Sequence, residues 1–71
     1  MTQAPIRVTV NGTAREFPTA PTFVEMLQAL AIEGRRLAIE RNGEIVPRSR
    51  LGEARLADGD RIEVVVAVGG G

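Results

Sequence analysis

Alternating apolar and polar residues open the chain and predict a strand. Ile6, Val8 and Val10 alternate with polar residues, which is the pattern of a strand with one buried face. The dipeptide Asn11-Gly12 follows directly, and both of its residue types tolerate the positive φ that a two-residue hairpin turn requires. We therefore expect this strand to turn back on itself in a hairpin.

A helix is predicted after the return strand. The return strand is expected over residues 14–18, with Phe17 as its main inward side chain. Thr22 and Glu25 have the spacing of a capping box, in which each side chain bonds the other residue's backbone N–H. We expect the helix over residues 23–32.

The predicted helix carries one apolar stripe that suits packing on a sheet. Its residues fall at i, i+4, i+7 and i+8, namely Phe23, Leu27, Leu30 and Ala31, with Val24 and Met26 beside them. Gly34 stands where a left-handed residue is expected to end the helix.

The second half of the chain predicts a second hairpin. A third strand is expected over residues 37–41, and Asn42-Gly43 gives another tight turn. A short fourth strand is expected over residues 44–46. Pro47 ends it and suits an edge position, where no ladder N–H is required.

The last strand has the longest apolar run. Residues 48–56 are expected to form a loop with one helical turn, and residues 57–60 form a turn by composition. The final strand is predicted over residues 61–68. Because residues 64–68 are all apolar, we expect a central strand that is covered on both faces.

The predicted order, β-β-α-β-β-β, indicates an α+β fold. One helix can cover one face of a single mixed sheet of four to five strands. The first and last strands are the most apolar, so we expect them to pair in parallel at the centre. This arrangement is the ubiquitin-like β-grasp. Residues 1–68 form the expected domain, and residues 69–71 form a flexible glycine tail.

Composition narrows the classes of function. The chain has 71 residues, which allows one thin core, and nine acidic residues balance nine basic ones. This balance argues against nucleic acid or a membrane as the main partner. The chain contains no cysteine and no histidine, and all its cations are arginine. We found no leader or membrane-span pattern, and therefore expect a soluble, cytoplasmic protein.

Acidic residues offer no convincing catalytic or metal site. Asp58 and Asp60 flank Gly59, but two carboxylates without further oxygen ligands fit a turn better than a metal site. No helix follows the terminal glycines, so they are not a phosphate-binding loop. We expect no metal, no catalytic residue and no cofactor bound by the chain itself.

Two features are candidates for contact with a partner protein. Arg48 and Arg50, with Arg55 nearby, form a basic loop that is either a docking site or simply a solvated surface. Val65 and Ala67 face away from the predicted helix, and either they contact a partner or loops cover them.

The three terminal glycines are the most informative feature. Glycine has no Cβ and loses the most backbone freedom on ordering, so three of them make a poor strand end. Such a tail can thread a channel that is too narrow for side chains and present the carboxylate of Gly71. A carboxylate becomes reactive once it is joined to AMP as a mixed anhydride. The alternative interpretation is a frayed strand end.

The chain resembles the ThiS family, the sulfur carriers of thiamine biosynthesis. The resemblance covers nearly the whole chain, and its last two stretches are the most specific. The matching stretches are Val8-Thr9-Val10-Asn11-Gly12, Asn42-Gly43-Glu44-Ile45-Val46-Pro47-Arg48-Ser49, Leu56-Ala57-Asp58-Gly59-Asp60-Arg61-Ile62-Glu63-Val64-Val65 and Ala67-Val68-Gly69-Gly70-Gly71.

This resemblance implies a specific chemistry and specific partners. Gly71 would be adenylated by a ubiquitin-activating-like adenylyltransferase that uses ATP and magnesium, and then converted to a thiocarboxylate. A cysteine desulfurase relay would supply the sulfur, and thiazole synthase would receive it. Gly70 and Gly71 correspond to the family's diglycine, and Gly69 extends the threading tail.

Three alternatives remain at the level of sequence. The small subunit of molybdopterin synthase has the same fold and ending, but usually a longer chain with prolines near the end of its last strand. A ubiquitin-like modifier would share the first activation step. An S4-like RNA-binding module resembles residues 41–64, but it needs two basic helices, and the predicted helix here has no arginine.

Overall fold

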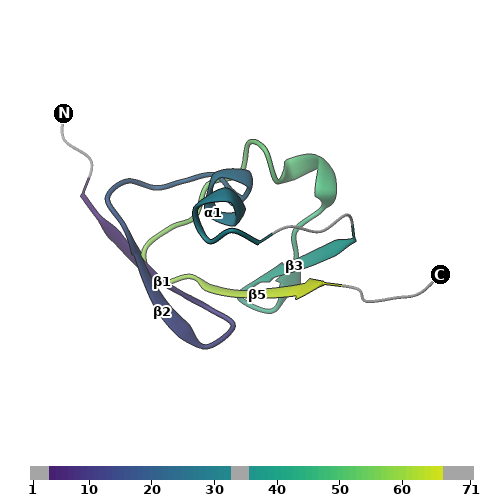
Figure 1. Cartoon of the computed structure of the whole chain (residues 1–71), viewed down its shortest axis with the longest axis horizontal. Coiled ribbons are helices and arrows are strands. Elements are labelled where there is room, and N and C mark those ends of the chain that lie inside the picture. Colours follow the sequence, from purple (N-terminus) through teal and green to yellow (C-terminus); the bar gives the residue numbers. More distant parts are fainter. Residues whose placement is uncertain (1–3, 33–35, 67–71) are drawn as a thin grey trace.

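The chain folds as a five-stranded mixed sheet with one helix on one face (Figure 1). The computed structural model describes residues 4–32 and 36–66. Its elements are β1 (Ile6–Val10), β2 (Thr13–Phe17), α1 (Phe23–Ala29), β3 (Leu37–Arg41), β4 (Glu44–Ile45), the 3-10 helix η1 (Arg48–Arg50) and β5 (Arg61–Val66). The strand order is β2-β1-β5-β3-β4. The predicted ubiquitin-like β-grasp is therefore confirmed.

The first and last strands pair in parallel at the centre of the sheet, as predicted. In the register, Thr9 lies opposite Arg61 and Val10 opposite Ile62. All other strand pairs in the sheet are antiparallel. Because parallel neighbours need a long crossover, the helix lies between them in sequence and packs over the sheet.

Both Asn-Gly dipeptides form the predicted tight turns. Asn11 and Gly12 have φ values of 50° and 82°, and Asn42 and Gly43 have values of 52° and 88°. Two consecutive positive φ angles give the turn whose twist matches that of the flanking strands.

The core lies between α1 and the inner face of the sheet. Phe23, Met26 and Ile62 have no exposed surface, and Phe17 is buried as expected. The other buried apolar residues are Ile6, Val8, Val10, Leu27, Ile39, Leu51, Leu56 and Val64. Met26, which was expected beside the helical stripe, is thus central to the core, whereas Ala31 is exposed.

The prediction that the last strand is covered on both faces is wrong. Ile62 and Val64 point into the core, whereas Arg61, Glu63 and Val65 are exposed. The strand is central in the sheet, but the helix covers only the inner face. Its apolar run therefore reflects β propensity as well as burial.

The helix begins as predicted. The Thr22 hydroxyl accepts a hydrogen bond from the Glu25 N–H at 3.1 Å, and the Glu25 carboxylate accepts one from the Thr22 N–H at 2.8 Å. Both halves of the capping box are therefore present.

The helix ends earlier than predicted. It stops at Ala29, and Ala31 takes the left-handed conformation with φ of 55°. The Ile32 N–H bonds the Leu27 carbonyl at 2.9 Å and the Ala31 N–H bonds the Gln28 carbonyl at 3.1 Å, which is the Schellman pattern. Gly34, the predicted cap, lies outside the described residues.

The third strand has its predicted bounds, and the boundaries of the second and fourth strands differ from the prediction by one residue. The return strand covers residues 13–17, and the fourth strand ends at Ile45. The predicted helical turn after Pro47 is η1. Val66 is the last described residue of β5, and residues 67 and 68 lie outside the described part. No helix among the described residues is long and apolar enough to cross a membrane.

Replacing Ala31 with glycine is expected to stabilise the fold. The left-handed conformation costs an L-residue about 1–2 kcal/mol, whereas the extra freedom of unfolded glycine costs about 0.4–1 kcal/mol. We expect Ala31→Gly to raise the free energy of unfolding by about 0.5–1 kcal/mol in urea titrations. The control Gln28→Gly, inside the helix, should lower it by about 1 kcal/mol. A loss of stability in Ala31→Gly would contradict the assigned cap.

The capping box should make stability depend on pH. The hydrogen bond from the Thr22 backbone, then that from its side chain and the charge of Arg55, lower the pKa of Glu25. A lowered folded-state pKa contributes stability above the pKa of the unfolded state, and this contribution disappears as pH falls through the folded value. We expect the stability difference between wild type and Glu25→Gln to shrink on acidification below pH of about 4.3. Thermal melts across that range test this, and a constant difference would exclude it.

Candidate functional site

The predicted reactive end follows the central strand of the sheet. Val66, the last described residue of β5, lies opposite Leu37 at the start of β3. Ala67 and the tail residues Gly69, Gly70 and Gly71 lie outside the described residues. The site that can be described is therefore the part of the sheet from which the tail continues.

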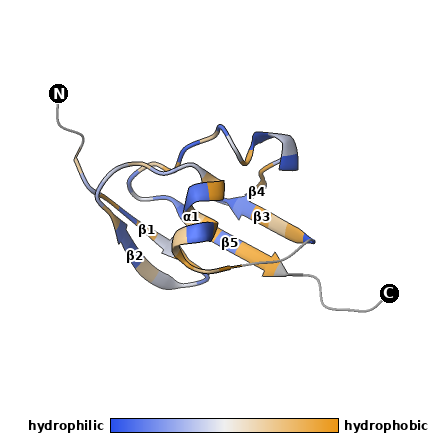
Figure 2. Cartoon of the chain, turned by 45° about the horizontal axis from the view of Figure 1, so that its top comes forward, coloured by the Kyte–Doolittle hydropathy of each residue, from blue (hydrophilic) through white to orange (hydrophobic). Residues whose placement is uncertain are grey.

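The outer face of the sheet near this end is apolar and open. Val65 is 58% exposed and lies opposite Ala38, which is also exposed. Ile45 on β4 is 72% exposed and belongs to the same face, because it lies opposite Glu40. Figure 2 shows the hydrophobic C-terminal end of β5 beside the hydrophobic start of β3. Of the two alternatives for Val65, cover by loops does not hold, because its side chain is exposed.

The predicted basic contact residues lie elsewhere. Arg48 and Arg50 belong to η1, which is on the same side of the sheet as α1 (Figure 1). Leu51, which follows directly, is buried, and its carbonyl accepts the Val24 N–H at 3.0 Å. Arg50 is paired with Glu53 at 3.1 Å. The structure thus does not bring Arg48 and Arg50 together with Val65.

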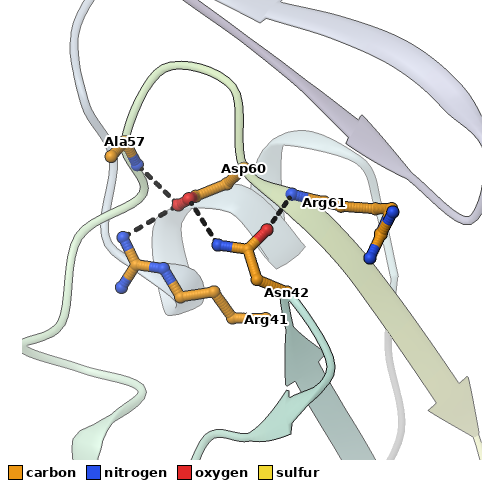
Figure 3. Close-up of polar contacts among 5 residues, drawn as sticks. All are labelled: Arg41, Asn42, Ala57, Asp60 and Arg61. Atoms are coloured by element: carbon orange, nitrogen blue, oxygen red, sulfur yellow. Dashed lines mark hydrogen bonds and ion pairs between the residues drawn. The ribbon is translucent and has the colours of Figure 1, made fainter.

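A buried carboxylate fixes the start of β5 (Figure 3). Asp60 is 7% exposed, and its carboxylate pairs with the Arg41 guanidinium at 2.8 Å. It also accepts hydrogen bonds from the Ala57 N–H at 2.8 Å and the Asn42 side-chain amide at 3.1 Å. Arg41 in turn lies over the ring of Phe23, 5.7 Å from its centroid. These contacts join β3, β5 and the helix.

The asparagines of both tight turns bond the backbone of β5. The Asn42 side-chain oxygen accepts the Arg61 N–H at 2.8 Å, and its backbone N–H donates to the Arg61 carbonyl at 2.8 Å. On the other side, the Asn11 side chain accepts the Val64 N–H at 2.7 Å and donates to the Val64 carbonyl at 3.1 Å. The asparagine of each turn therefore bonds the β5 backbone in the way that a further residue of the neighbouring strand would.

These anchoring roles were missed in the sequence. The Asn-Gly pairs were interpreted as turns alone, and Asp60 as one of two turn carboxylates. The turn itself is present, and an internal hydrogen bond runs from the Ala57 N–H to the Asp60 carboxylate. The Asp58 carboxylate instead accepts the Arg7 N–H of β1 at 2.8 Å. The available signal was the position of Asp60, immediately before the last strand.

Within residues 4–32 and 36–66, no group of three or more acidic or other metal-ligating side chains lies close enough together to hold a metal ion.

Comparison with known proteins identifies the family. The sequence profile described as "ThiS family" matches residues 8–71, a range that includes the three terminal glycines. The chain belongs to the ThiS family. The chain is 40% identical over 50 residues to the sulfur carrier protein ThiS of Bacillus subtilis, covering 70% of this chain and 76% of the relative.

The fold agrees with that of a solved family member. A crystal structure of the thiamine biosynthesis protein ThiS from Geobacter metallireducens matches with a TM-score of 0.79 and 29% identity. The match covers 93% of this chain and all of the other. The predicted family is therefore confirmed.

Two further relatives are much longer proteins. The chain is 38% identical over 66 residues to a thiazole synthase of Paramagnetospirillum magneticum, and 32% identical over 66 residues to one of Magnetococcus marinus. Each match covers 93% of this chain, which spans only 20% of the length of either thiazole synthase.

Removing the Asp60 carboxylate should destabilise the ThiS fold strongly. Asp60→Ala leaves the Arg41 guanidinium and two N–H groups without their acceptor, and breaking a buried pair costs about 3–5 kcal/mol. Because the Arg41 side chain is 30% exposed, we expect about 2–4 kcal/mol. The control Asp58→Ala removes an exposed carboxylate of the same turn and should cost about 1 kcal/mol or less. Chemical denaturation of both variants tests this, and equal losses would contradict the anchoring role.

Proposed function

We propose that this chain carries sulfur as a thiocarboxylate on its terminal residue, Gly71, and delivers it for thiazole formation. The observation that supports this most directly is the family match, which runs through the glycine tail to Gly71. The absence of cysteine agrees with it, since sulfur cannot be held on a side chain of this chain. The sulfur then has to be held at the main-chain terminus.

The chemistry requires activation of the terminal carboxylate. A free C-terminal carboxyl has a pKa of roughly 3.3–3.7, so it is ionised near neutral pH and repels nucleophiles. Attack of a carboxylate oxygen on the α-phosphate of ATP forms the acyl adenylate and releases pyrophosphate. Hydrosulfide can displace AMP and give the thiocarboxylate directly. A persulfide donor instead gives an acyl disulfide, and a second thiol must then attack the donor sulfur, forming a disulfide with the donor and releasing the thiocarboxylate. Glycine leaves the carbonyl carbon unhindered.

Three partners would complete this cycle. A ubiquitin-activating-like adenylyltransferase would hold ATP and magnesium, and a cysteine desulfurase relay would supply sulfur. Thiazole synthase would accept the sulfur. The two thiazole synthases that contain a segment similar to this chain support the last partner.

The geometry limits where a partner can bind. Five residues follow Val66, so Gly71 can reach at most about 17 Å beyond it. A partner that holds Gly71 in its active site must therefore approach the end of β5. The exposed outer-face residues Val65, Ala38 and Ile45 lie at that approach. Gly69 and Gly70 would thread into the partner, beside Ala67.

Arg48 and Arg50 remain candidates for a separate contact. They lie on the helix side of the sheet, so a partner that covers Val65 would reach them only around the β4 edge. We therefore assign the first contact to the outer face.

Removal of Gly71 should abolish sulfur loading and leave the fold intact. Wild type and a variant lacking Gly71 are incubated with ATP, the adenylyltransferase of the same organism and a sulfide source, and then analysed by intact-mass spectrometry. We expect an oxygen-to-sulfur exchange in the wild type only. Methionine oxidation adds nearly the same mass, so the exchange must be mapped to tryptic peptide 62–71, which contains no methionine.

Two results would contradict this proposal. One is a wild-type chain that gains no sulfur although the adenylyltransferase is active in an ATP–pyrophosphate exchange assay. The other is equal loading of the variant that lacks Gly71. We expect the wild type and the variant to have the same thermal midpoint, because all buried core residues described lie before the tail in sequence.

A further inference from the structure

The side chain of Asn11 takes the place of a strand residue beside β5. Its oxygen accepts the Val64 N–H at 2.7 Å, and its amide donates to the Val64 carbonyl at 3.1 Å. One side chain therefore bonds both backbone groups of a single residue, as a residue of an antiparallel neighbouring strand does. These two hydrogen bonds form the Asn11 clamp.

The clamp lies where β1 stops supporting β5. The register of the two strands runs only as far as Val10 and Ile62, and the Asn11 N–H still reaches the Ile62 carbonyl at 2.9 Å. The backbone groups that point to this side recur at every second residue of β5, so those of Val64 come next and those of Val66 follow. The clamp therefore supports one further residue of β5 on this side.

On its other side, β5 is paired with β3 up to its last described residue. Ala38 lies opposite Val65, and Leu37 lies opposite Val66. With the clamp, the strand has a neighbour on both sides as far as Val64. Without it, the strand has only β3 beside it after Ile62. Because strand ends with few hydrogen bonds open most readily, the clamp decides how far toward the tail β5 is held.

We infer that Asn11 is a positioning residue for the reaction at Gly71, because its clamp on Val64 holds the end of β5 from which the tail continues. The inference rests on the proposed function. Gly71 is seven residues beyond Val64. An enzyme that binds Gly71 has to order every residue between its own site and the held part of β5, and each residue that it orders lowers its affinity for the carrier.

The effect of the clamp is expected in KM and not in kcat. The residues before Gly71 are ordered when the carrier binds, before its carboxylate attacks ATP. Loss of the clamp therefore weakens the ground-state complex and the transition state equally, which raises KM alone. A side chain that served only the stability of the fold would change neither parameter at a temperature at which the variant stays folded.

Asn42 provides a matched control at the other end of β5. It also precedes a glycine, and its φ of 52° is close to the 50° of Asn11. Its side chain bonds the Arg61 N–H at 2.8 Å and the Asp60 carboxylate at 3.1 Å, at the start of the strand. Asn11→Gly and Asn42→Gly thus remove equivalent side chains, and glycine accepts the positive φ at both positions.

The test measures activation and strand opening in the same variants. Pyrophosphate release by the adenylyltransferase of the same organism is followed with saturating ATP, sulfide and increasing concentrations of each carrier, well below every thermal midpoint. Hydrogen exchange of the Val64 and Val66 amides is measured by NMR in the free proteins. Asn11→Asp and Asn42→Asp keep an acceptor oxygen and form a second, milder pair.

We expect Asn11→Gly to raise KM for the carrier about fivefold at unchanged kcat, since a net hydrogen bond shifts an equilibrium by roughly two- to tenfold. Its Val64 amide should exchange about tenfold faster. Asn11→Asp loses only the bond to the Val64 carbonyl and should raise KM about twofold. Asn42→Gly should lose at least as much thermal stability, because Asp60 also loses a donor, but keep the wild-type KM and kcat.

An unchanged KM in Asn11→Gly would overturn the inference, and so would an equal rise of KM in Asn42→Gly or a fall in kcat alone. If a glycine variant does not fold, the same comparison between the two aspartate variants decides. A wild-type chain that causes no pyrophosphate release contradicts the proposed function, and the inference then fails with it. An active wild type with the same KM as Asn11→Gly overturns the inference alone.

Discussion

The buried carboxylate of Asp60 determines how the last strand enters the sheet. It lies at the junction of the turn at residues 57–60, the end of β3 and the core ring of Phe23. A carboxylate at this depth is tolerated only when its oxygens are bonded, and here a guanidinium, a side-chain amide and a backbone N–H bond them. Any other path of the chain into β5 would leave these groups without partners. The network therefore specifies one register for the strand that precedes the tail.

The same strand is held from both sides by asparagine side chains. Asn42 bonds the backbone of Arg61, and Asn11 bonds that of Val64. Parallel pairing of β1 with β5 covers only a short stretch of register, so the Asn11 side chain extends it where the β1 backbone turns away. A strand fixed along its length makes a rigid base for a tail.

The two faces of the sheet serve different purposes. The inner face is closed by the helix and by Leu51 and Leu56, and it supplies the stability of a small domain. The outer face is not covered by the helix, and it bears the facing glutamates Glu40 and Glu63 and exposed apolar residues. Residues that contradict good sheet design are expected where a protein binds a partner. In the proposed function, a partner that reacts with the terminal glycine approaches the molecule beside this face.

The sequence by itself determined the elements, the two Asn-Gly turns, the capping box and the central parallel pair. The elements, the turns and the cap follow from local rules, because periodicity, turn chemistry and capping act over a few residues. The central parallel pair follows from the apolarity of the first and last strands and from the helix that lies between them. The glycine tail also pointed to the family without any knowledge of the fold. Tertiary structure alone decided the roles of Asp60, Asn11 and Asn42, since their partners lie far away in sequence. It also decided that Val65 is exposed and that Glu40 meets Glu63, because an apolar run and two distant glutamates carry no information about register until the strands are paired.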